Sequence, residues 1–352
     1  MRAAKKRLLL ILGLAALLLA LLGAVRCAGI TPALGSYDEI HLISEEPPPE
    51  EALVHLREAL EIPIETVQVE TLFHIIPVDA ADLDPVRNRK NLLFLVDLSR
   101  REQITSLARD MLGAEKLNEV IRTGEPAIYF LENAWARQQT HAYLVAPTAA
   151  FFPIAAEEMG TRIRNGFLQS NRKRILEFLF FRGEKMTLAR QIYERFGWRI
   201  RMPAGFQVRL DHMEEGFFSM RMDRPGRMLF VHWRGGVEAL PSPNEAIALR
   251  DSLGRVFYDE DYVEPSRTSA FPGTFQGREA VRIQGLWQNE KYTIGGPFRS
   301  ILFFVPEEKR LFLIDYAVYA PSFPKKYYLW ELEAVVETFT LEPPPEPEGS
   351  RS

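Results

Sequence analysis

The chain has 352 residues, of which 47% are hydrophobic and 26% are charged, so it can form packed cores and two or three domains. The formal net charge is −4. The segment up to Cys27 holds five positive charges and no negative one, which leaves −9 for the remainder. A mildly acidic body argues against nucleic-acid binding, which needs a concentrated basic surface. A single cysteine excludes an intramolecular disulfide and a thiolate metal cluster.

The amino-terminal sequence predicts that the protein is exported or inserted into a membrane. Four basic residues among the first seven precede eighteen uncharged residues, Leu8 to Val25. As a helix this run is roughly 27 Å long, close to the thickness of a bilayer core. It has no polar face, which argues against a buried core helix and predicts export or membrane insertion. The preceding basic residues predict that the body lies outside the inner membrane.

Cys27 follows the apolar run directly, where a bacterial lipoprotein carries its lipid. Arg26 stands before it, where lipoprotein signals prefer a small residue. Two interpretations remain open: a divergent lipoprotein lipidated at Cys27, or an uncleaved N-terminal anchor. Both predict a membrane-anchored protein of the bacterial cell envelope, with its globular body in the periplasm or otherwise outside the inner membrane.

The predicted fold class is α+β, in two mixed parts after the N-terminal signal or anchor. We predict an anchor and linker over 1–36, an N-terminal α/β domain over 37–197, a C-terminal α+β domain over 198–342, and a disordered Pro- and Glu-rich tail over 343–352.

The first part reads as strands separated by helices. The apolar run NLLFLVD at 91–97 predicts a strand covered on both faces. Ser99 and Glu102 match a capping box that would open the next helix. Residues 126–147 predict a hairpin. A long helical tract after Pro147 is predicted to break near Gly166 and Gly183, and Gly197 to end the last helix.

The second part switches to period-two alternation at about residue 198. Ser242 to Glu245 combine a capping box with a proline at the first helical position. An irregular stretch is predicted for 258–277, followed by strands and a closing helix. The predicted architecture is an antiparallel sheet flanked by helices.

Three separated stretches carry a family resemblance: RFGWRIRMPAGFQV, REAVRIQGLWQNEKYTIGGPFRS and AVYAPSFPKKYYLWELEAVVETF. They are similar to the signature stretches of a family of uncharacterised bacterial envelope lipoproteins, known as a domain of unknown function. The element order of the second part, opened by MPAGF, resembles the PsbP-like fold. The resemblance implies an exported, lipid-anchored, two-part α+β protein and supplies no activity, cofactor or catalytic residue.

No catalytic, metal or cofactor motif is visible. The six histidines lie far apart, without the spacing of a zinc motif, and the chain has no nucleophile elbow, Walker A loop or dinucleotide fingerprint. We therefore predict no catalytic residue, no metal site and no cofactor.

Two carboxylates have both a structural and a functional interpretation. Asp97 ends a buried strand, where ligands of open α/β sheets bind, but its favoured role is to cap the adjacent helix. Asp315 shares a strand face with apolar residues, so its pKa should be raised, which would suit acid–base chemistry. Its favoured interpretation is a buried acid paired with an arginine, such as Arg282 or Arg299.

Three further segments also have both a structural and a functional interpretation. Residues 171–185 mix basic and aromatic side chains, as a surface for nucleic acid or acidic lipid would. We favour a buried stripe of Ile175, Phe178 and Leu179 with solvated charges. VHWRGG (231–236) and YDEDY (258–262) resemble loops that line binding clefts, though such loops are more often only solvated.

GLWQNEKYTIGGPFRS (285–300) is the densest stretch in Gly, aromatic and charged residues. The structural interpretation is a distorted strand connection that needs glycines for shape. The functional one is a binding site for a partner, a carboxylate or a sugar. Its candidate residues, with the nearby acid, are Trp287, Tyr292, Gly295, Gly296, Arg299 and Asp315.

Three functions remain open. The first is a membrane-tethered, non-catalytic binding or assembly module of the envelope, with a protein partner and no nucleic acid. The second is an envelope enzyme, hydrolase-like, that uses Asp315 and Asp97. The third is a purely structural envelope protein.

Overall fold

The computed structural model describes residues 31–344, except for the Leu210 side chain. Cys27, the predicted anchor up to residue 30 and the tail from 345 lie outside the described residues. The described chain forms two compact units. The N-terminal unit contains 31–56 and 75–163, and the C-terminal unit contains 57–74 and 164–344.

The boundary differs from the one predicted at 197/198. Helix α6 (Phe152–Phe180) is continuous through Gly166, where the sequence predicted a break, and the division falls inside this helix. It also falls inside α2 (Glu50–Leu60). A glycine is tolerated in a helix interior at a cost of about 1 kcal/mol, so Gly166 alone does not end α6.

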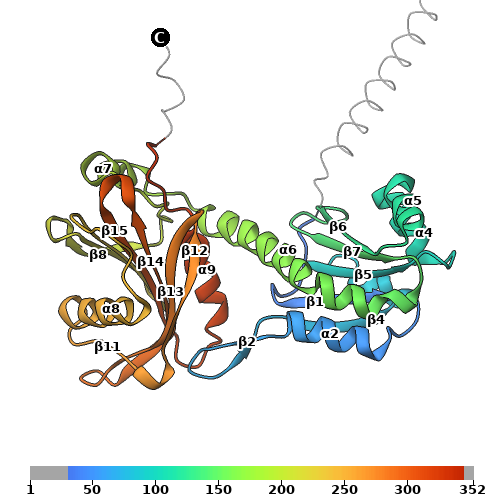
Figure 1. The fold of residues 1–352 in the computed structure, drawn as a ribbon, viewed down its shortest axis with the longest axis horizontal. Coiled ribbons are helices and arrows are strands. Elements are labelled where there is room, and N and C mark those ends of the chain that lie inside the picture. Colours follow the sequence, from blue (N-terminus) through green and yellow to red (C-terminus); the bar gives the residue numbers. More distant parts are fainter. Residues whose placement is uncertain (1–30, 345–352) are drawn as a thin grey trace, which may run out of the picture. The chain divides into compact units, whose positions relative to one another are not determined.

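The N-terminal unit is built on a five-stranded sheet in the order β4-β1-β5-β7-β6 (Figure 1). β1 pairs with β5, and β5 with β7, in parallel, whereas β6 and β7 form the predicted antiparallel hairpin. The strands are β1 (Glu39–Ser44), β4 (His74–Asp79), β5 (Asn91–Asp97), β6 (Ala127–Glu132) and β7 (Thr140–Ala146). The helices are α3 (Leu83–Val86), α4 (Gln103–Leu112) and α5 (Ala114–Thr123).

β5 is central in this sheet, which explains why its sequence is apolar on both faces. The first six of its residues are buried. Phe94 stacks on Tyr143 of β7 with ring centroids 4.7 Å apart. Residues on α4 and α5, such as Ile104 and Leu117, complete the same core. The strand predicted to be covered on both sides is confirmed.

The C-terminal unit is built on an eight-stranded antiparallel sheet in the order β11-β13-β14-β15-β10-β9-β8, with β12 beside β13 (Figure 1). The strands are β8 (Gln207–His212), β9 (Phe217–Met222), β10 (Gly226–Arg234), β11 (Tyr262–Val263), β12 (Ser269–Phe275), β13 (Arg278–Asn289), β14 (Ile294–Val305) and β15 (Arg310–Tyr319). A separate two-stranded ribbon joins β2 (Pro63–Ile64) to β3 (Glu70–Thr71).

Helices cover this sheet: α7 (Met186–Phe196), α8 (Pro243–Phe257) and α9 (Lys326–Val336). α8 and α9 lie on opposite faces (Figure 1), as strand alternation requires. Ser300 and Asp315, which are paired in register, face α8 through Arg250, whereas Arg299 faces α9 through Glu333. The predicted α+β class, with an antiparallel sheet flanked by helices, is confirmed; the described residues form eight α-helices.

Some predictions from local sequence motifs are confirmed and others are wrong. The Ser242–Glu245 capping box is confirmed, as is the stop at Gly197, which is left-handed with φ 69°. The predicted box at Ser99–Glu102 is wrong, because α4 begins at Gln103 and Glu102 makes no side-chain cap. The irregular stretch was also mispredicted: Ser269–Phe275 pairs with β13 as β12.

Candidate functional site

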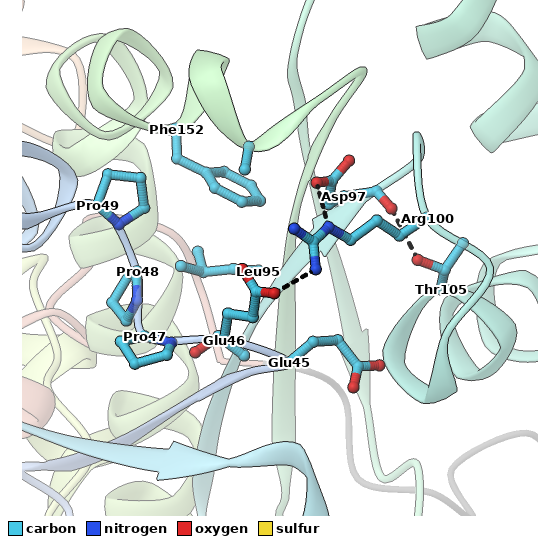
Figure 2. A pocket seen from close by; sticks show the side chains of 12 residues that line it. Glu45, Glu46, Pro47, Pro48, Pro49, Leu95, Asp97, Arg100, Thr105 and Phe152 are labelled. Carbon is cyan, nitrogen blue, oxygen red and sulfur yellow. Dashed lines mark hydrogen bonds and ion pairs between the residues drawn. The ribbon is translucent and has the colours of Figure 1, made fainter.

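The N-terminal unit has a cavity of about 180 Å³ at the carboxyl ends of β1 and β5 (Figure 2). Leu95, Phe152 and the prolines 47–49 give it apolar walls, and Asp97 and Arg100 line its charged side. This is the edge at which open α/β sheets bind ligands, as considered for Asp97.

The polar groups of this cavity satisfy one another. Arg100 Nη1 lies 2.5 Å from Glu46 Oε1, and Arg100 Nε lies 3.6 Å from Asp97 Oδ2. The Asp97 carboxylate also accepts from the Ser99 N–H at 2.9 Å, which closes a turn ahead of α4. The cap on α4 itself is Glu45, whose carboxylate accepts from the Ile104 N–H. The role predicted for Asp97 as a helix cap therefore belongs to Glu45, and the cavity offers a ligand little unsatisfied hydrogen-bonding capacity.

A larger cavity, of about 510 Å³, lies in the C-terminal unit. We call it the Trp287 cavity. Its aromatic and apolar walls come from β9, β10, β13, β14 and the end of α8. Its lining residues are Arg209, Ser219, Met220, Arg221, Met228, Phe257, Tyr258, Asp259, Asp261, Trp287, Asn289, Tyr292 and Ile294.

Trp287 lines this cavity and is almost fully buried. It lies in β13, is only 2% exposed, and belongs to the core that α8 covers. Its indole Nε1–H has no hydrogen-bond partner within residues 31–344. A buried donor without an acceptor costs about 1–3 kcal/mol, so such groups call for an explanation, and a ligand acceptor would provide one.

Asp261 provides a titratable group beside it. The side chain is 8% exposed, and burial raises its pKa to about 6, although a hydrogen bond from Asn289 and the charge of Arg250 favour the carboxylate. Asn289 Nδ2 donates to Asp261 Oδ1 at 2.6 Å and to the Asp259 carbonyl at 2.9 Å. The buried amide thereby fixes the 259–261 loop against the end of β13.

Tyr292 stands at the rim, 53% exposed, on the turn between β13 and β14. Its hydroxyl donates to Asp259 Oδ2, which also receives the Lys291 ammonium at 2.7 Å. Hydrogen bonds from Lys291 and Tyr292 lower the pKa of Asp259. Neighbouring carboxylates of one loop thus have pKa values shifted in opposite directions.

Arginines supply positive charge at the other side. Arg209 Nη2 lies 3.1 Å from Asp223 Oδ2, and Arg221 Nε lies 2.5 Å from Asp223 Oδ1. Both arginines also line a second, open cavity of about 820 Å³, with Arg224 and Tyr328 among its other lining residues. The two cavities therefore have Arg209 and Arg221 as common lining residues.

The predicted site residues do not form one site. Trp287 and Tyr292 line the Trp287 cavity. Asp315 lies on the same sheet face but is 2% exposed and does not line it; burial raises its pKa, against the charge of Arg250 and the Ser300 hydrogen bond. Arg299 is on the opposite face, 3.1 Å from Glu333.

The prediction that Asp315 is a buried acid paired with an arginine is confirmed, but the partner is Arg250 and neither of the two arginines suggested. Arg250 of α8 donates to its carboxylate at 3.2 Å, and Ser300 at 2.6 Å. Arg282 and Arg299 point to the other face because they alternate with Ile283 and Ser300 along their strands. An acid–base role for Asp315 together with Arg299 and Trp287 would need an open cleft that all three share, and only Trp287 lines the cavity.

The glycine pair also has a structural role. Gly295 and Gly296 are not in a connection but within β14, paired with Gln288 and Trp287. A Cβ at Gly296 would overlap the Val318 carbonyl oxygen, and one at Gly295 would lie 2.6 Å from the Trp287 carbonyl oxygen. The space beside both glycines is filled by the protein's own main chain rather than left for a ligand.

The candidate residues did not include Asn289, although it lies within the 285–300 stretch, nor Arg209 and Arg221, which nothing in their local sequence marks. The YDEDY stretch, in contrast, carried a usable signal: Tyr258, Asp259 and Asp261 all line the Trp287 cavity. VHWRGG did not; its first four residues end β10.

Two further points concern metal ligands and membrane-spanning helices within residues 31–344. No group of three or more His, Cys, Asp or Glu side chains within residues 31–344 is placed to hold a metal ion. None of the helices there has both the length and the hydrophobicity to cross a membrane.

The fold is α+β, and the C-terminal unit contains a cavity of the size that a small ligand would occupy. Residues 185–338, nearly all of that half, match the model of a domain of unknown function, DUF4837. No curated protein matches the chain.

Two solved structures are similar over part of the chain. A protein from Bacteroides thetaiotaomicron VPI-5482 matches with 17% identity and a TM-score of 0.25, over 42% of this chain and 46% of that one. The Saccharomyces cerevisiae Ran-binding protein Mog1p matches with 12% identity and a TM-score of 0.29, over 41% of this chain and 90% of that one. The chain thus spans about half the length of the Bacteroides protein.

Proposed function

We propose that the protein is a non-catalytic binding or assembly module of the bacterial cell envelope, tethered to a membrane by its N-terminal segment. Its C-terminal unit would hold its ligand in the Trp287 cavity. The tether, whether a lipid on Cys27 or an uncleaved anchor, rests on the apolar run at 8–25 and the basic residues before it. The PsbP-like arrangement of the C-terminal unit and the lipoprotein character are parts of this proposal.

The unpartnered indole N–H of Trp287 carries the proposal. A ligand carboxylate or hydroxyl oxygen would accept from it, and Asn289 with Asp261 would supply further polar contacts. Phe257, Tyr258 and Tyr292 offer aromatic surface for stacking, and Arg209 with Arg221 attract negative charge. Apolar walls with a few convergent polar groups are typical of small-molecule sites. This combination fits a small hydroxylated or carboxylate-bearing ligand, such as a sugar acid or a peptide end.

Calorimetric titration of the detergent-solubilised full chain tests the proposal. The probes are glucuronic acid, an N-acetylated amino sugar and a short peptide with a free carboxylate. Trp287→Phe keeps an aromatic ring but removes the N–H, so we expect the affinity for a binding probe to fall about tenfold or more.

Trp198→Phe is the matched control. Trp198 is also fully buried with an unpartnered Nε1 among the described residues, but it does not line the cavity. Its variant should bind as the parent does. Equal affinity of the parent and Trp287→Phe, or failure of every probe to bind, would contradict the proposal.

The hydrolase-like alternative retains one specific observation, the opposite pKa shifts of Asp261 and Asp259. Separated pKa values in neighbouring carboxylates are a pattern of acid–base catalysis. Asp261→Asn distinguishes the two functions: product formation from glycan or peptide probes by the parent, lost in the variant, favours an enzyme. Binding without turnover favours the module.

A further inference from the structure

Three large apolar side chains are exposed where α6 ends and α7 begins. Phe178 is 67% exposed, Phe181 88% and Met186 61%. We call these three residues the apolar corner. Ile175 and Leu179 of the same stretch are buried, as predicted, but Phe178 is not, because no described element covers that side of the last turn of α6. Three exposed large apolar groups within nine residues form the kind of patch that marks an interaction surface.

The corner has a defined conformation. The Gly183 N–H donates to the Phe180 carbonyl at 2.9 Å, and Gly183 is left-handed with φ 100°. The Lys185 N–H donates to Met202 O at 2.9 Å, and the Ala204 N–H to Gly183 O at 3.0 Å. These bonds fix the turn to the 202–204 segment and leave Phe181 pointing outward.

The neighbouring aromatic is arranged differently. The Arg201 guanidinium lies 3.8 Å from the centroid of the Phe180 ring, and its Nη2 lies 2.8 Å from Glu184 Oε2. Phe180 is thus covered by a paired cation, while Phe178 and Phe181 on either side of it remain open. The same ion pair neutralises Glu184, the acid closest to the turn.

Two cations lie in the same segment as the apolar corner. Arg182 is exposed and Lys185 half-buried, and neither side chain has an ion-pair partner in the part of the chain that the structure describes. With Glu184 paired to Arg201, these two cations give the corner a positive character on an otherwise acidic body.

We propose that the apolar corner docks on an anionic membrane surface, with Phe178, Phe181 and Met186 in the headgroup region and Arg182 and Lys185 on lipid phosphates. Apolar tips flanked by Lys and Arg are the composition of interfacial membrane contacts. The occupant is a membrane rather than a protein because the proposed tether keeps the body beside one. The inference rests on that tether and is independent of the Trp287 cavity.

The test uses the full chain in lipid nanodiscs, one set of phosphatidylcholine alone and one containing phosphatidylglycerol. The readout is hydrogen exchange of the amides of residues 178–186. We expect exchange to be several-fold slower in the anionic discs than in detergent. Phe178→Ser with Phe181→Ser should abolish that protection, and Arg182→Gln with Lys185→Gln should abolish its dependence on phosphatidylglycerol.

Val256→Ser is the matched control, since Val256 is 68% exposed on α8, away from the corner. It should leave the protection intact. Equal exchange in detergent and in both kinds of disc would overturn the docking proposal. So would protection that depends on protein concentration, which would indicate a second copy of the chain. Failure of the tether itself is distinguishable, because the chain would then not co-purify with the discs at all.

Discussion

Arg250 Nε lies 3.2 Å from Asp315 Oδ2, and the two side chains are 4% and 3% exposed. α8 and β15 are thereby joined by a charge pair inside the core of the C-terminal unit. The pair accounts for a carboxylate among apolar residues without any catalytic role.

Removing one partner should be more damaging than removing both. Asp315→Ala leaves Arg250 buried and unpaired, so we expect the unfolding free energy to fall by about 3–5 kcal/mol. Asp315→Leu combined with Arg250→Met should recover most of that loss. Urea unfolding followed by near-ultraviolet circular dichroism measures both. As a control, Glu238→Gln, in an exposed pair with Lys309, should change stability by only about 0.5 kcal/mol or less. Equal losses of stability in Asp315→Ala and in the double variant would contradict this account.

Asp261 should make stability depend on pH. Its folded pKa of about 6 lies above the ordinary 3.8, so between these values the folded state binds more protons than the unfolded state. The unfolding free energy should therefore fall as pH rises through this window, by at most about 3 kcal/mol. Asp261→Asn should remove this component of the slope. Denaturant titrations at a series of pH values measure how the unfolding free energy depends on pH. An unchanged dependence in the Asp261→Asn variant would show that another group is responsible.

Gly296 should not tolerate a side chain. Gly296→Ala would drive a Cβ against the Val318 carbonyl within the sheet, and we expect a loss of about 3 kcal/mol or more, or failure to fold. Gly235→Ala is the control, because a Cβ there meets nothing within 4 Å. Thermal unfolding compares the two. Similar melting temperatures would mean that β14 can shift away from β15 at little cost.

Fractionation of cells that express Cys27→Ser should separate the two possible tethers. A lipid on Cys27 as the sole anchor predicts release of the variant into the soluble periplasmic fraction. An uncleaved apolar segment predicts unchanged membrane retention. Arg26→Gly alone, which restores the small residue that lipoprotein signals prefer, should increase lipidation if that pathway operates.

Patterns that depend on near neighbours were predictable from the sequence. The Ser242 capping box and the left-handed stop at Gly197 are local. Strand alternation in 281–287 predicts one common face for Val281, Ile283 and Trp287, and all three belong to the same core. The strand at 91–97 was recognisable because its residues 92–96 are apolar on both faces.

What failed depended on contacts between distant segments. The partner of Asp315 comes from α8, 65 residues away, and nothing near either residue indicates it. Ser269–Phe275 looks irregular alone and becomes a strand because β13 is long enough to pair with it. The cavity joins β8 and β9 to the loop at 259–261 and the end of β13. The 258–262 and 285–300 stretches had a recognisable local composition, whereas β8 and β9 had none.

β8 ends the large sheet, and within the described residues no further strand covers its outer side. Its pairing with β9 is irregular between Val208 and Leu210, at Arg209. A short, charged and irregular outermost strand is a poor template for pairing with another chain, so Arg209 helps to keep copies of the protein from joining edge to edge. An apolar replacement of Arg209 would therefore promote aggregation, and under the proposed function it would also weaken ligand binding. Arg221 lies on β9, one strand away from the edge of the sheet. A substitution there would change the charge of the Trp287 cavity without altering the outermost strand.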